Sequence, residues 1–96
     1  MGWKYVMVKN KIGDTMILVP LIFPDKLIHS MVYEATKPIM PGWRSGGGIK
    51  AISAGKIEHI EVDGLGGDSE TLRLTSRGNE DRKVIENYSY LHGIMP

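Results

Sequence analysis

The chain has 96 residues, with 12 lysines and arginines against 11 aspartates and glutamates, and it contains no cysteine. This length predicts a single domain, residues 1–96, and the lack of cysteine excludes disulfides and thiolate metal sites. Because the charge is nearly balanced, the chain lacks the basic excess of proteins that bind duplex nucleic acid.

The N-terminal third predicts a hairpin and a helix. Residues 3–9 alternate as a strand does, turn residues follow, and the apolar residues 15–23 predict a second strand. We expect Pro20 at a sheet edge or a bulge, since proline cannot donate a backbone hydrogen bond. Helical spacing then predicts a helix over residues 25–36. Its apolar stripe consists of Leu27, Ile28, Met31, Val32 and Ala35.

The rest of the chain predicts a loop, three strands and a second helix. Glycines and prolines predict a loop over residues 38–48. Residues 49–63 are expected to be extended, with an interruption at Ala54–Gly55. Residues 64–69 predict a turn and residues 70–74 a short strand. A helix is expected after Asn79 as its N-cap, with Gly93 as its C-cap.

This order, β-β-α-β-β-β-α, predicts an α+β fold with a small antiparallel sheet of four to five strands and two helices. The second strand is apolar on both faces. If both helices cover one face, the other exposes an apolar patch that a second copy would cover, so we expect a homodimer or larger oligomer. The alternative is that the helices lie on opposite faces.

The sequence GWRSGGGIK, residues 42–50, is one candidate anion site. Backbone N–H groups near the glycines could converge on an anion, Arg44 and Lys50 could add charge, and Trp43 could stack on a base. The spacing is not that of a nucleoside-triphosphate loop. A flexible connection is the favoured alternative.

A second polar cluster spans residues 66–82 and includes Ser69, Thr71, Ser76 and Arg77. Arg77 precedes a helix N-terminus, where the helix dipole disfavours a cation unless an anion lies between them. A bound anion would resolve this conflict. In the alternative, the serines cap turns and the charges pair locally.

Other chemistry finds little support in the sequence. The three histidines, His29, His59 and His92, lack the spacing of a metal-ligand pair, and no serine stands in a nucleophile elbow. We therefore expect no metal, no cofactor and no catalytic residue. The longest apolar run, residues 16–23, is too short to span a bilayer, and a cytoplasmic protein is expected.

Three segments, VPLIFPDKLIHSMV, ISAGKI and GGDSETLRLTSR, resemble short accessory proteins encoded by bacteriophages and prophages. The matching positions are Ser53, Ala54, Gly55, Ser69, Glu70, Thr71, Ser76 and Arg77. The resemblance implies a role against host defences. Such proteins either sequester nucleotide-like signals between subunits or block a host protein by surface contact.

The sequence thus predicts a non-enzymatic oligomer that binds a small anionic, nucleotide-like ligand at a subunit junction. The expected ligand-binding residues are Trp43, Arg44, Lys50, Ser69, Thr71, Ser76 and Arg77. The alternative is a protein-interaction module that inhibits a host protein without a small ligand.

Overall fold

The computed structural model describes residues 2–45, 48–58 and 64–92. In chain order the elements are β1 (Trp3–Ile12), β2 (Thr15–Pro24), α1 (His29–Thr36), the 3-10 helices η1 (Lys37–Ile39) and η2 (Pro41–Ser45), β3 (Ile49–Ile57), β4 (Leu65–Gly66), β5 (Asp68–Ser69), β6 (Leu74–Thr75) and α2 (Asn79–His92). Neither helix α1 nor α2, nor any other helix in these ranges, is long and apolar enough to cross a bilayer.

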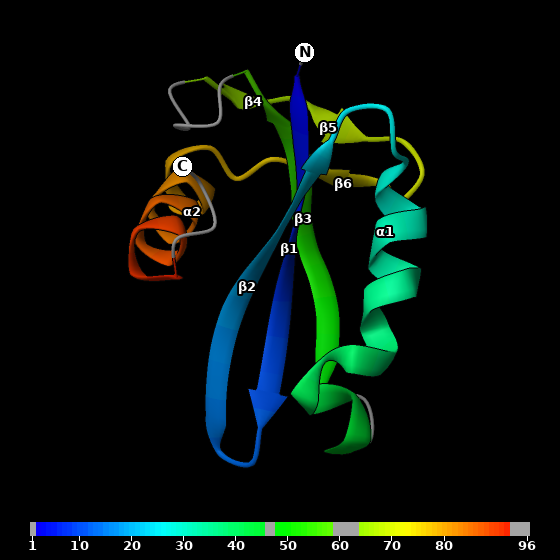
Figure 1. Ribbon diagram of the computed structural model, residues 1–96, viewed down its shortest axis with the longest axis vertical. Helices are drawn as coiled ribbons and strands as arrows, with labels where there is room; N and C mark the ends of the chain where they lie inside the picture. The colour runs from blue at the N-terminus through cyan, green and yellow to red at the C-terminus, as the bar shows by residue number, and fades with distance from the viewer. Residues whose placement is uncertain (1, 46–47, 59–63, 93–96) are drawn as a thin grey trace.

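The α+β prediction is confirmed. Strands β2, β1, β3 and β4 form an antiparallel sheet in that order, and β5 pairs with β6 in a separate two-stranded sheet (Figure 1). Hairpin β1–β2 closes through the two-residue turn Gly13–Asp14. Gly13 has a φ of +61°, which glycine adopts without strain.

Pro20 lies in the edge strand, as expected. Ile12 and Thr15 flank the two-residue turn and therefore form a hydrogen-bonded pair, after which the pair types alternate. Counting along the register, Pro20 and Met7 form a pair without hydrogen bonds. The nitrogen of Pro20 consequently faces the open edge, so its missing proton removes no hydrogen bond between β2 and β1.

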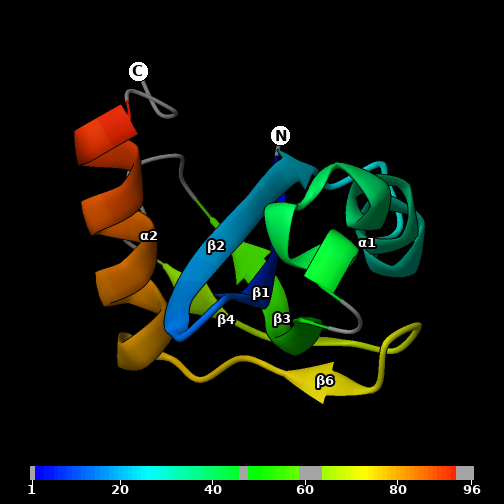
Figure 2. The ribbon, with the colours of Figure 1, turned by 90° about the horizontal axis from the view of Figure 1, so that it is seen from below.

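The two helices lie on opposite faces of the sheet (Figures 1 and 2). Tyr5 packs with Ile85 of α2, whereas its neighbour Val6 packs with Val32 of α1. The expectation of a sheet face left bare by both helices is therefore wrong, and the alternative arrangement holds. The homo-oligomer stays a prediction, without support from a bare sheet face.

A β-bulge in β3 changes which face its side chains occupy. Met7 of β1 pairs with Ser53 and Val8 with Ala51, so Ile52 has no partner in this register. Ile52 and Ser53 consequently share the face that carries α2. The irregularity predicted at Ala54–Gly55 is thus displaced to Ile52, where the twisted sheet accommodates one extra residue.

Helix α1 begins later than predicted and buries a different side. It starts at His29 rather than residue 25, because residues 25–27 turn away from β2. His29, at 5% exposure, is buried, whereas Met31, at 62%, is exposed. Of the predicted apolar stripe, Val32 packs against the sheet and the other four residues are exposed, since contact with the sheet decides which residues are buried.

Three other predicted boundaries change. The expected loop over residues 38–48 contains η1 and η2. Residues 70–73 form a turn rather than a strand, and short strands occupy part of the turn predicted over residues 64–69. The predictions for residues 59–63 and Gly93 fall outside the described residues.

Candidate functional site

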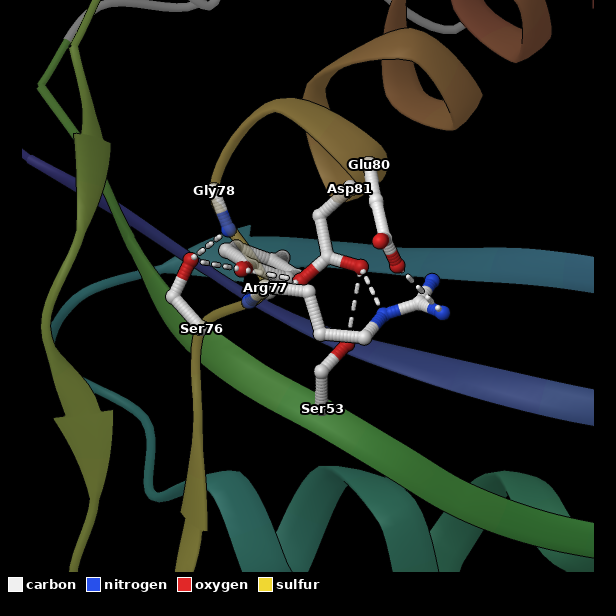
Figure 3. Close-up of polar contacts among 7 residues, drawn as sticks. Ser53, Ser76, Arg77, Gly78, Glu80 and Asp81 are labelled. Atoms are coloured by element: carbon white, nitrogen blue, oxygen red, sulfur yellow. Dashed lines mark hydrogen bonds and ion pairs between the residues drawn. The ribbon is translucent and has the colours of Figure 1, made fainter.

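A buried carboxylate anchors helix α2 to the sheet (Figure 3). Asp81, fully buried, accepts hydrogen bonds from the Tyr5 hydroxyl at 2.7 Å and from Ser53 Oγ at 2.9 Å. Arg77 donates to the same carboxylate through its backbone nitrogen at 2.9 Å and through Nε at 2.8 Å. Donors from β1, from β3 and from the turn before α2 thus converge on the Asp81 carboxylate.

These hydrogen bonds keep Asp81 ionised. Burial raises the pKa of Asp81, but the hydrogen bonds from Tyr5, Arg77 and Ser53 together outweigh burial and lower that pKa below its ordinary value. Burial, together with the hydrogen bond to Asp81, raises the pKa of Tyr5. The pair is therefore a neutral phenol that donates to a carboxylate.

Ser76 and Arg77, both predicted to bind a ligand, belong to this network. Ser76 Oγ accepts from the backbone nitrogen of Gly78 at 3.1 Å and lies 2.7 Å from the Tyr5 hydroxyl. The anion that an arginine needs at a helix start is supplied by Asp81, with Glu80 3.5 Å from Arg77 Nη1. This geometry matches the alternative of local pairing for both residues.

A cavity of about 340 Å³ lies at the other face of the sheet, beside the start of α1. It is lined by Lys4, Ile28, His29, Lys56, Gly67, Asp68, Glu70 and Thr71. We call it the main cavity. Its size is within the usual range for small-ligand sites.

Two lysines of the main cavity face each other across neighbouring strands. Lys4 of β1 pairs directly with Lys56 of β3, and like charges at such positions repel. Asp68 and Glu70 line the same cavity. None of these four side chains forms an ion pair within the described part of the chain; Lys4 Nζ instead donates to the Leu27 carbonyl at 3.0 Å.

His29 forms part of the cavity wall. Its Nε2–H donates to the Gly55 carbonyl at 3.0 Å, and its ring meets Phe23 edge to face. Burial lowers the pKa of His29, and the charges of Lys4 and Lys56 lower it further, against the effect of the Gly55 hydrogen bond. The neutral imidazole is thus held in a fixed orientation, as expected for a satisfied, buried histidine.

The main cavity contains one of the predicted residues and lies beside a second. Thr71 lines it, and Thr71 Oγ1 accepts from the backbone nitrogen of Ser30 at 3.2 Å, in the first turn of α1. Ser69, buried, lies 3.3 Å from Thr71 between their hydroxyl oxygens, and its Oγ accepts from the Leu72 nitrogen. Ser69 therefore supports the turn that carries Thr71.

The predicted residues of the glycine-rich segment lie elsewhere. Trp43 and Arg44 are exposed on η2, and Lys50 lies near the start of β3, at the opposite end of that strand from Lys56. The structure therefore distributes the seven predicted residues over three regions, rather than joining them in one site within a chain.

Sequence reasoning missed Lys4, Lys56, Asp68 and Glu70 as cavity residues. Alternation alone places Lys4 on one face of β1, but only the register with β3 brings Lys56 opposite it. No group of three histidine or carboxylate side chains in the described ranges could hold a metal ion.

Comparison of the chain with protein-family models, with curated proteins and with solved structures found no match.

Proposed function

We propose that the chain is a non-enzymatic binding domain whose ligand occupies the main cavity and carries both an anionic group and an amino group, as a nucleotide does. One observation carries this proposal: side chains of both charge signs line one cavity without pairing with each other among the described residues. A ligand with complementary charges would satisfy both sets.

The two ends of the ligand have distinct partners in this proposal. Lys4 and Lys56 attract the phosphate, and the first turn of α1, which contains no acidic residue, favours an anion there. Asp68 and Glu70 accept hydrogen bonds from the amino group. Because one chain forms the whole cavity, this site does not require a subunit junction.

The resemblance to phage and prophage proteins suggests a biological setting. On that basis we propose a phage-type accessory protein that sequesters a nucleotide-like signal in the host cytoplasm and so counters host defence. This part rests on the resemblance alone.

Thermal unfolding in the presence of nucleoside monophosphates and cyclic dinucleotides, which lack a triphosphate, tests the binding proposal. A ligand at 100 times its dissociation constant adds about 2.7 kcal/mol to the free energy of unfolding. Lys56→Gln should abolish the shift in Tm, whereas Lys26→Gln, at an exposed turn, should not change it. If none of the compounds shifts Tm, or if both variants respond equally, the main cavity is not their site.

A protein-interaction module is the second candidate, favoured by exposed apolar side chains along α1 and η1. Met31 is 62% exposed and Ile39 is 78% exposed, and exposed apolar side chains that adjoin one another mark interaction surfaces. Light scattering of the wild type and Met31→Glu tests self-association through this surface. A wild-type particle heavier than 10.7 kDa that dissociates in Met31→Glu supports self-association through this surface. A mass of 10.7 kDa for the wild type at every concentration contradicts self-association.

A further inference from the structure

A second cavity, of about 200 Å³, lies at the end of β3 that is far from the main cavity. Its lining consists of Lys9, Lys11, Gly48, Ile49 and Lys50. The ionisable side chains in this lining are all lysines, in contrast to the mixed charges of the main cavity. We call it the lysine cavity.

The register of the sheet forces two of these lysines together. Lys9 and Lys50 are direct partners across β1 and β3. Neither has an ion-pair partner in the described ranges of the chain, so their repulsion is not offset there by a carboxylate. Lys11 follows two residues after Lys9 and thus lies on the same face.

The two lysine pairs of β1 and β3 lie on opposite faces of the sheet. Lys4 and Lys9 differ by an odd number of positions on β1, so they point to opposite sides. Lys50 and Lys56 would share a face in a regular strand, but the bulge at Ile52 lies between them and reverses the alternation. One bound molecule therefore cannot contact both lysine pairs.

From this geometry we propose that the lysine cavity is a separate binding site for a phosphate chain, such as the triphosphate of a nucleotide or free polyphosphate. The bound anion lies between Lys9 and Lys50, and its attraction to each lysine offsets the repulsion between them. Lys11 adds a third positive charge at the rim. A chain of phosphates matches a cavity with several ammonium groups better than a single carboxylate does.

Titration calorimetry with inorganic triphosphate tests this site, and ATP and orthophosphate distinguish the possible sources. Triphosphate should bind as tightly as ATP and at least tenfold more tightly than orthophosphate, because the site recognises the phosphate chain. Raising the salt concentration should weaken binding, since the contacts are ionic. Absence of triphosphate binding at millimolar concentration would overturn the proposal.

Charge reversal gives the sharper test. Lys50→Glu should weaken triphosphate binding at least tenfold and, without ligand, raise Tm, because a Lys9–Glu pair replaces two like charges. Lys26→Glu, an equal charge change at an exposed turn, should do neither.

Lys56→Gln should leave triphosphate binding intact, which separates this site from the main cavity. Equal losses in Lys26→Glu and Lys50→Glu would show a general charge effect and refute the site. If Lys50→Glu does not fold, Lys9→Gln provides the same comparison.

Discussion

The hydroxyl of Tyr5 donates a 2.7 Å hydrogen bond to the buried carboxylate of Asp81, across 76 positions of the chain. This contact joins β1 to α2, and the other donors to Asp81 among the described residues come from β3 and from the turn before α2. The network gives a chain of 96 residues a polar centre that the hydrophobic core alone would not specify.

Asp81→Asn should lower the free energy of unfolding by about 2–4 kcal/mol, because it removes the charge and leaves buried donors with a poorer acceptor. Urea denaturation measures this loss. Glu80→Gln is the matched control, since the Glu80 side chain is 75% exposed, and it should change stability by less than about 0.5 kcal/mol. Similar losses in both variants would mean that Asp81 is not the centre of the network.

His29 should make stability depend on pH near neutrality. The pKa of His29 in the folded chain lies below the ordinary 6.5, so the unfolded chain binds the proton first as pH falls. This contribution is complete above pH 6.5 and is lost as the pH falls through the folded pKa. The urea midpoint of the wild type should thus fall between pH 7.5 and 5.5, and that of His29→Gln, which retains a donor for Gly55, should fall less. Parallel pH profiles would contradict this assignment.

Gly55→Ala should destabilise the chain by about 1–3 kcal/mol through overpacking. A Cβ atom on Gly55 would lie 2.5 Å from the carbonyl oxygen of Gly66, a backbone atom that cannot rotate away. Gly66→Ala is the control on the paired strand, because a Cβ there meets no heavy atom within 4 Å. Thermal unfolding should rank Gly55→Ala well below both the wild type and Gly66→Ala; equal Tm values for the two variants would refute the clash.

Arg73→Gly should stabilise the turn between β5 and β6 by about 0.5 kcal/mol. Arg73 has a φ of +56°, a left-handed conformation that costs an L-residue about 1–2 kcal/mol and costs glycine little. Glu70→Gly, in the same turn without a positive φ, should instead destabilise it, because glycine there only adds freedom to the unfolded chain. Chemical denaturation of Arg73→Gly and Glu70→Gly should give changes of opposite sign in the free energy of unfolding.

Local sequence patterns predicted the helices and strands better than they predicted the contacts between them. Alternation and turn residues identified the β1–β2 hairpin, and the requirement of proline for an open edge placed Pro20 correctly. The exposed side of α1 was not predictable, since the short helix packs through His29 and Val32 as the sheet dictates. The strand expected at residues 70–74 failed because Arg73 takes up a left-handed turn conformation.

The two cavities were less predictable than the fold, because each depends on the register of β1 and β3. The sequence marks Arg77 as a cation that needs an anion, and Asp81 was not singled out as that anion, although the two residues are only four positions apart. Lys4 and Lys56 become a pair only when β1 and β3 align. Ser69 and Thr71 were selected as polar residues, and the structure places Thr71 at the wall of the main cavity.

Ile52 is one extra residue in β3, so the side chains before and after it do not follow a single alternating pattern. Because Ala51 already pairs with Val8 and Ser53 with Met7, removing Ile52 would restore regular alternation and leave every later side chain of β3 on its present face. Ser53 would still reach Asp81, and Lys56 would stay on the face opposite Lys50. One codon deletion would therefore spare both the anchor of α2 and the separation of the two lysine pairs, and would remove only the packing of Ile52 against the core around Tyr5 and Ile85.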